Sequence, residues 1–93
     1  MNADRERRTV LYSGRVQGVG FRARTAHLAQ RFPVVGYVRN LPNGSVELVV
    51  EGSPESVRAF LGAVAGAMAW EIEEAEESAA SATGEFDAFN IKA

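Results

Sequence analysis

Apolar side chains recur along the chain with periods that alternate between those of strands and helices. Residues 9–15 are rich in β-forming side chains and predict a first strand. Residues 16–21 contain two glycines and predict a loop. Residues 22–32 predict a helix, which Pro33 ends because the residue before a proline avoids helical backbone angles. One face of this helix has the i, i+3, i+4, i+7 spacing and carries Thr25, Leu28, Ala29 and Phe32.

The next part of the pattern predicts a hairpin followed by a second helix. Residues 34–40 and 45–50 predict two strands, and the Pro-Asn-Gly sequence at 42–44 is typical of the turn between them. Ser53 predicts a helix N-cap, and Pro54 suits the first helical position, so a helix is expected from there to about residue 68. Its apolar face consists of Val57, Phe60, Leu61, Val64 and Met68.

Two more strands complete the predicted set. A fourth strand at 70–75 is followed by a flexible loop at 78–85 and a short last strand within 86–91. The order β-α-β-β-α-β, with room for one extra edge strand, is typical of the ferredoxin-like fold. We therefore expect an α+β sandwich in which two helices cover one face of an antiparallel four- to five-stranded sheet. The chain is short enough for a single domain, 1–93, in which residues 1–8 are expected to be flexible.

Charge is distributed unevenly, although the net charge is only -2. Between residues 7 and 46 there are seven arginines and no acid, whereas residues 47–93 contain ten acids and two basic residues. An arginine-rich stretch without acids indicates an anion site. The alternative is a solvated surface that happens to be uneven.

Composition argues against several classes of protein. The sequence has no cysteine, which excludes disulfides, a thiol nucleophile and a cysteine metal site. It shows neither a signal-peptide pattern nor the run of about 20 apolar residues that a membrane span needs. A pI of 5.4 and the lack of aromatic residues at 45–50 argue against a nucleic-acid-binding module with this fold. We expect a cytoplasmic protein with no nucleic-acid or membrane partner.

The segment between the first strand and the first helix has an unusual composition for a helix start. It runs Gly-Arg-Val-Gln-Gly-Val-Gly-Phe-Arg over residues 14–22. A helix N-terminus exposes unpaired N–H groups, which Ser, Thr, Asp or Asn normally caps. No side chain from Gly18 to Phe21 can do so, and Arg22 and Arg24 add positive charge to the positive end of the helix dipole. A bound anion would accept hydrogen bonds from the free N–H groups and would pair with the positive charge. The alternative is a plain glycine turn with a solvated Arg22.

Two segments of the chain resemble the signatures of the acylphosphatase family. The first is residues 14–22, and the second is Gly-Tyr-Val-Arg-Asn at 36–40 followed by Gly44, Val46 and Gly52. They occur in the family's order and spacing, and the resemblance extends to the last strand. It implies the ferredoxin-like fold. It also implies hydrolysis of the carboxyl–phosphate bond of acyl phosphates to a carboxylate and inorganic phosphate, without a metal or other cofactor.

The resemblance also implies the site residues and partners. Arg22 would bind the phosphate together with N–H groups of the loop, and Asn40 would orient the attacking water. The expected partners are a small acyl phosphate as substrate and inorganic phosphate as product and inhibitor, with the protein as a monomer. Pro33, Tyr37 and the residues after Ile91 depart from the family pattern but leave both catalytic positions intact. The loop residues expected to bind substrate are Arg15, Val16, Gln17, Gly18, Val19, Gly20 and Phe21.

The other reactive side chains are few, and this fits the implied chemistry. The only histidine, His27, lies off the apolar face of its helix, so we expect it at the surface. Arginine, asparagine and backbone amides stabilise charge and position reactants but supply no general acid. A carboxylate leaves without protonation, because its conjugate acid has a pKa of about 4, whereas an alkoxide needs a proton or a metal.

Two alternatives stay open at this point. On the residues alone, Asn40 could equally be a turn asparagine that precedes the sequence at 42–44. The segment at 16–22 also resembles the N-terminal domain of the carbamoyl transferases of hydrogenase maturation. That domain belongs to a much longer chain, so a free-standing enzyme is expected here.

Overall fold

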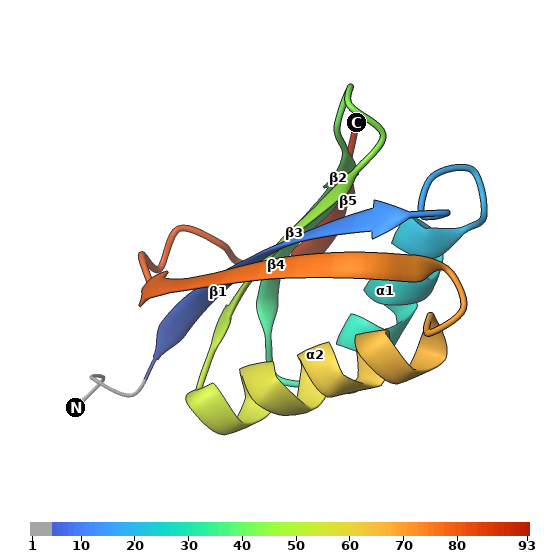
Figure 1. Ribbon diagram of the computed structural model, residues 1–93. Helices are drawn as coiled ribbons and strands as arrows, with labels where there is room; N and C mark the ends of the chain where they lie inside the picture. Colours follow the sequence, from blue (N-terminus) through green and yellow to red (C-terminus); the bar gives the residue numbers. More distant parts are fainter. Residues whose placement is uncertain (1–4) are drawn as a thin grey trace.

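The computed structural model of the protein describes residues 5–93 and shows a sheet covered by two helices (Figure 1). Both helices lie on the same face of the sheet, whose strand order is β4-β1-β3-β2-β5. The predicted ferredoxin-like α+β fold is therefore confirmed, with five strands. No helix in the described range is both long and apolar enough to cross a membrane. The elements are β1 (Glu6–Gly14), α1 (Phe21–Ala29), β2 (Val35–Asn40), β3 (Val46–Gly52), α2 (Pro54–Ala67), β4 (Ile72–Ser81) and β5 (Phe89–Lys92).

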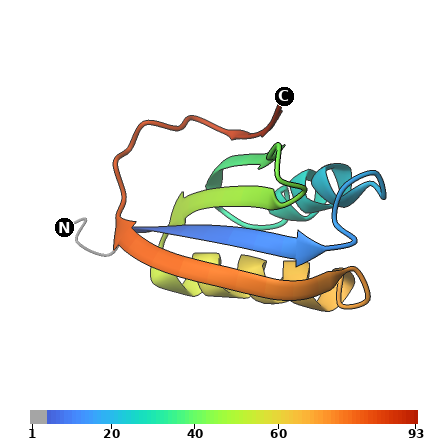
Figure 2. The ribbon, with the colours of Figure 1, turned by 45° about the horizontal axis from the view of Figure 1, so that its top comes forward.

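The sheet is mixed rather than wholly antiparallel. β1 pairs antiparallel with β3 and β4, and β2 pairs antiparallel with β3. β5 pairs parallel to β2, with Gly36 opposite Phe89 and Arg39 opposite Lys92. The prediction of an antiparallel sheet was therefore wrong for the last strand. The reason is the connection at residues 82–88, which leads from one edge of the sheet to the other and brings β5 in alongside β2 (Figure 2).

Two strands are longer than the sequence pattern predicts. β1 begins at Glu6, within the stretch expected to be flexible; residues 1–4 of that stretch lie outside the described residues. β4 continues to Ser81, so the expected flexible loop was wrong for residues 78–81, which pair with residues 6–9 of β1. Glutamate, serine and alanine disfavour a strand locally, but pairing with a complete neighbouring strand overrides that preference.

Helix α1 ends earlier than predicted. Its last α-helical residue is Ala29 and not residue 32. The N–H groups of residues 30–32 donate to carbonyl oxygens three residues back, at 3.0 to 3.2 Å. This is the 3₁₀ pattern, which often forms the last turn of a helix. Pro33 has no N–H to continue it.

The core lies between the helices and the central strands. Helix α2 begins as predicted, because Ser53 Oγ accepts a hydrogen bond from the N–H of Ser56 at 3.2 Å. The Phe60 ring of α2 lies 5.8 Å from that of Phe32 and 5.6 Å from that of Phe89. These contacts join α2 to the turn after α1 and to β5. The buried apolar residues are Val10, Tyr12, Val16, Phe21, Ala29, Val34, Val38, Val46, Leu48, Val49, Val50, Val57, Phe60, Val64 and Met68.

A buried carboxylate attaches the β4–β5 connection to the face of the sheet opposite the helices. Glu51 of β3 is 0% exposed, and its oxygens accept hydrogen bonds from the N–H groups of Thr83 at 2.9 Å and Gly84 at 3.1 Å. Arg7 Nε donates to it at 2.8 Å. Burial by itself would raise the pKa of Glu51, but these donors and the Thr83 hydroxyl outweigh it and lower the pKa to about 2. We call residues 82–88, held in this way, the strap.

Replacing Glu51 by glutamine is expected to lower the free energy of unfolding by about 2–4 kcal/mol at pH 7, because Arg7 and the strap N–H groups lose a charged acceptor in a buried site. The stabilisation is complete above the ordinary pKa of 4.5 and is lost as the pH falls from there toward 2. The difference in the free energy of unfolding between wild type and variant should therefore become smaller from pH 7 to pH 2.5, as measured by urea unfolding.

Glu47→Gln is the matched control for this prediction, on the same strand and the same face. Glu47 is 17% exposed and pairs with Arg39, which is 40% exposed, so solvent weakens the interaction. Glu47→Gln should therefore lower the free energy of unfolding by less than about 1 kcal/mol. Equal losses for the two variants would show that the strap does not depend on the buried charge.

Candidate functional site

The loop between β1 and α1 turns through two glycines with left-handed backbone angles. Gly18 has a φ of 78° and Gly20 a φ of 81°, a region that other residues rarely occupy. Gly20 is the N-cap of α1, no side chain caps the helix, and the first turn contains no acid. The predicted uncapped start is thus present, and the first N–H groups of α1 have no partner within the helix. Such an end binds anions.

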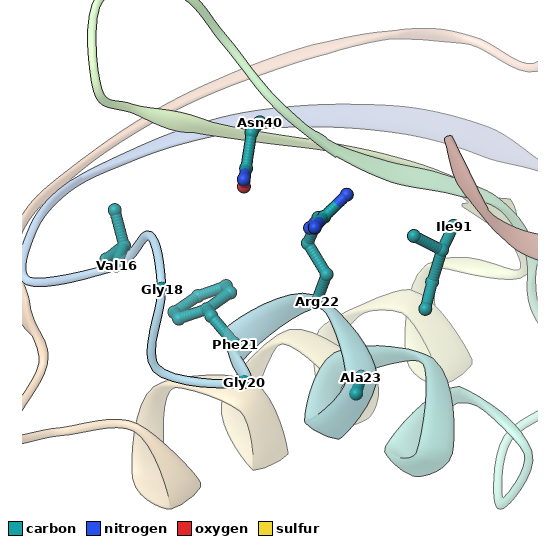
Figure 3. Close-up of a pocket in the computed structure, with 8 residues that line it drawn as sticks. All are labelled: Val16, Gly18, Gly20, Phe21, Arg22, Ala23, Asn40 and Ile91. Atoms are coloured by element: carbon teal, nitrogen blue, oxygen red, sulfur yellow. The ribbon is translucent and has the colours of Figure 1, made fainter. Parts of the chain in front are cut away.

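A pocket of about 180 Å³ lies where this loop meets the ends of β2 and β5 (Figure 3). It brings together Arg22 of the first motif and Asn40 of the second. Its polar groups are these two side chains and the loop backbone; among the residues that the structure describes, no carboxylate or imidazole lines it. The lining residues are Val16, Gly18, Gly20, Phe21, Arg22, Ala23, Asn40 and Ile91.

Arg22 directs its guanidinium into this pocket from the first turn of α1 (Figure 3). Its Nη1 makes a long contact of 3.4 Å with the carbonyl oxygen of Lys92. Within residues 5–93 no carboxylate pairs with it, although six other ion pairs are present. A half-buried guanidinium without an acid partner suits a phosphate, because its planar fork can donate to two oxygens at once.

Asn40, the last residue of β2, directs its amide into the same pocket (Figure 3). Its Oδ1 is buried and accepts no hydrogen bond from any residue that the structure describes. An unpaired buried acceptor costs about 1–3 kcal/mol, so this position suits a donor from outside the chain. The role of turn asparagine is filled by Asn43, whose Oδ1 accepts a hydrogen bond from the N–H of Ser45 at 3.0 Å.

The other loop residues predicted to bind substrate divide into two groups. The Phe21 ring packs 5.2 Å from that of Tyr12 and anchors the helix start to β1. The Gln17 amide donates to the carbonyl oxygens of Leu41 at 2.9 Å and Ser45 at 2.8 Å, and it thereby ties the loop to the β2–β3 turn. No local pattern could indicate this anchor, because its acceptors lie 24 and 28 residues further along the chain. Val16, Gly18, Gly20 and Phe21 line the pocket, whereas Arg15, Gln17 and Val19 do not.

Arg24 serves helix packing and not the pocket, although it lies close to Arg22 in sequence. Its Nη2 donates to the carbonyl oxygen of Ala67 at 2.7 Å, and its Nη1 lies 3.5 Å from Glu71 Oε2. Ala67 is the last residue of α2, so this arginine satisfies a carbonyl at the negative end of that helix. His27 is exposed, as predicted.

Comparison with known proteins agrees with the two motifs that form the pocket. The acylphosphatase family model matches residues 8–91. The chain belongs to the acylphosphatase family. A relative named acylphosphatase from Anaeromyxobacter dehalogenans is 42% identical over 97% of this chain and 98% of its own. The resemblance inferred from the two motifs is thereby confirmed, and it places the chain in a family of hydrolases that act on acid anhydrides.

Two further acylphosphatases show the extent of the similarity. The one from Thermococcus kodakarensis is 57% identical over 49 residues, a match that spans 53% of this chain and 54%, about half, of the relative's length. The crystal structure of acylphosphatase from Bacillus subtilis is 25% identical, with a TM-score of 0.85 over 95% of this chain and 99% of that one. The acylphosphatase fold is therefore shared along nearly the whole chain.

Proposed function

We propose that this protein hydrolyses acyl phosphates to a carboxylate and inorganic phosphate, with Arg22 binding the phosphoryl group and Asn40 orienting the water. The proposal is carried by one observation: among residues 5–93, a guanidinium without an acid partner, an uncapped helix start and the Oδ1 of Asn40 without a donor meet at a single pocket. These groups are donors for an anion and an acceptor for a water beside it.

The phosphoryl group would be held by electrostatics alone. The guanidinium of Arg22 donates to two of its oxygens, and the N–H groups at the start of α1 donate to the others. These donors are fixed in place before the substrate arrives, because Gln17 and Phe21 anchor the loop on both sides. Fixed donors stabilise the charge that spreads over the phosphoryl oxygens in the transition state without having to reorganise.

Asn40 would supply the position of the nucleophile. Its Oδ1 accepts a hydrogen bond from a water, which attacks phosphorus in line with the acyl oxygen. The bond between phosphorus and the acyl oxygen breaks, and the carboxylate leaves with the electron pair. The proton that the water loses remains on the phosphate product, so no side chain has to take it up.

We further propose that the reaction needs no metal. Within residues 5–93, no three His, Asp or Glu side chains are grouped as a metal site requires. Arg22 and the helix start supply the positive charge that a metal would otherwise provide. A monomeric state and a cytoplasmic location remain predictions from the sequence and the family.

Replacing Asn40 by alanine is expected to lower kcat for acetyl phosphate by on the order of 10² or more, while the inhibition constant for inorganic phosphate changes little. An interaction made only in the transition state lowers the rate without weakening ground-state binding. Steady-state kinetics in a buffer with EDTA measure both values, and wild type is expected to be fully active there.

Asn43→Ala is the control, since Asn43 is exposed in the β2–β3 turn and does not line the pocket. It should leave kcat close to wild type. If inhibition by phosphate weakened in Asn40→Ala as much as the rate fell, Asn40 would bind substrate and would not position water. Loss of wild-type activity in EDTA, with recovery on adding magnesium, would contradict the metal-free proposal.

A further inference from the structure

An exposed apolar side chain that phosphate binding does not require lines the anion pocket. In the part of the chain that the structure describes, the large apolar side chains that stay exposed are Val19 (46%), Trp70 (95%) and Ile91 (47%). Ile91 lines the pocket, and Val19 lies in the loop that forms it. Exposed apolar surface at a binding site indicates contact with a partner of the same character. A phosphoryl group is not such a partner, so the organic part of the substrate is the candidate.

Ile91 is not a core residue, although it lies on a strand that contributes to the core. Phe89, two residues earlier on the same face of β5, packs against Phe60 with ring centroids 5.6 Å apart. Ile91 is absent from the apolar cluster that includes Phe89. It lines the pocket instead, and Figure 3 shows it on the side of Arg22 away from Asn40.

The geometry of the reaction places the acyl group on this side. Attacking and leaving oxygens are in line, so the acyl group departs from the side of the phosphorus opposite the water. In the proposed function the water lies at Asn40. Figure 3 shows Arg22 between Asn40 and Ile91, which puts Ile91 on the leaving-group side.

We infer that Ile91, with Ala23 of the same pocket lining, forms an apolar wall for the acyl group, so that the protein prefers acyl phosphates with an apolar, above all an aromatic, acyl group over those with a carboxylate. The inference rests on the proposed function. An aromatic ring against Ile91 removes apolar surface of both from water. A carboxylate in the same place loses hydration, and Arg22, the only cationic side chain of the pocket within residues 5–93, already binds the phosphoryl group.

The first test compares benzoyl phosphate with acetyl phosphate in wild type and Ile91→Ala. The ratio of their kcat/KM values is expected to fall about tenfold in the variant, which is what the loss of a few methylene contacts gives. Inorganic phosphate has no acyl group, so its inhibition constant reports on the groups that bind the phosphoryl group. This constant should change less than twofold. Trp70→Ala is the control, since it removes an exposed apolar side chain outside the pocket and should leave the ratio unchanged.

The second test uses Ile91→Lys, whose aliphatic stem can take the place of the isoleucine while its charge lies at the pocket mouth. The ratio of kcat/KM for succinyl phosphate to that for benzoyl phosphate should rise at least tenfold relative to wild type. A variant that hydrolyses its substrates with an altered preference must be folded. Ratios in both Ile91 variants equal to those of wild type would overturn the inference and leave the proposed function standing. A wild-type protein that hydrolyses none of these substrates would instead overturn the proposed function.

Discussion

Benzoyl phosphate is expected to be hydrolysed at least about 10⁴-fold faster than glycerol phosphate at equal concentration, the upper range of what a missing general acid contributes. The reason is that none of the side chains that the structure describes in the pocket can protonate a departing alkoxide. His27 is exposed on another face of α1, and Asp87 belongs to the strap. Burial, together with a smaller effect of Glu77, raises the pKa of Tyr12, and this residue does not line the pocket.

Release of inorganic phosphate from three substrates by the purified protein measures this discrimination. Aryl phosphates with acidic phenols should fall between the acyl and the alkyl substrate, because their leaving groups need protonation less than an alkoxide does. Arg22→Ala controls for a contaminating phosphatase. Comparable rates on the acyl and alkyl substrates, both dependent on Arg22, would mean that the site contains a general acid.

Replacing Arg22 by alanine is expected to lower kcat/KM for acyl phosphates by on the order of 10² or more and to abolish inhibition by phosphate, because the main charge-stabilising donor is lost. Arg22→Lys should not restore activity, since a point charge cannot grip two phosphate oxygens as a planar fork does. A lysine variant with nearly normal kinetics would contradict the bidentate role of Arg22.

Arg22→Ala should leave the protein folded and at least as stable as wild type. The only hydrogen bond of Arg22 to a residue that the structure describes is the 3.4 Å contact with Lys92, and its charge opposes the dipole of α1. Arg24→Ala is the matched control, since it removes an arginine from the same helix that bonds to Ala67 outside the pocket. It should retain activity and lose about 1 kcal/mol of stability, the reverse of the result for Arg22→Ala.

Local signals in the sequence predicted most of the fold and the two motifs of the site. The start of α2 follows from Ser53, and the β2–β3 hairpin follows from the turn at 42–44, because these signals act within a few residues. The missing cap before α1 pointed to the loop, and the structure brings Arg22 and Asn40 to one pocket there. The roles of these two residues remain predictions.

Features that depend on distant contacts could not be predicted in the same way. The full length of β4 comes from its pairing with β1, and the direction of β5 comes from the course of the strap. Glu51 lies just after the strand predicted at 45–50 and no local pattern marks it, because its partners Thr83 and Gly84 lie 32 and 33 residues away. Ile91 was expected only as part of the short last strand within 86–91, since the sequence does not show that this strand extends past the core.

The strap has a consequence for partial unfolding. β5 pairs with one neighbour only, over four residues, and the strap that leads to it is attached at Glu51, at Tyr37 through Phe86 and at Gly36 through Ala88. Local opening of residues 82–92 would leave the other four strands and both helices paired and packed, so it should need less free energy than global unfolding. Ile91 would leave the pocket in that state, while Arg22 and Asn40 would stay. Substrate preference is then the first property that a loosened molecule loses, and phosphate binding the last.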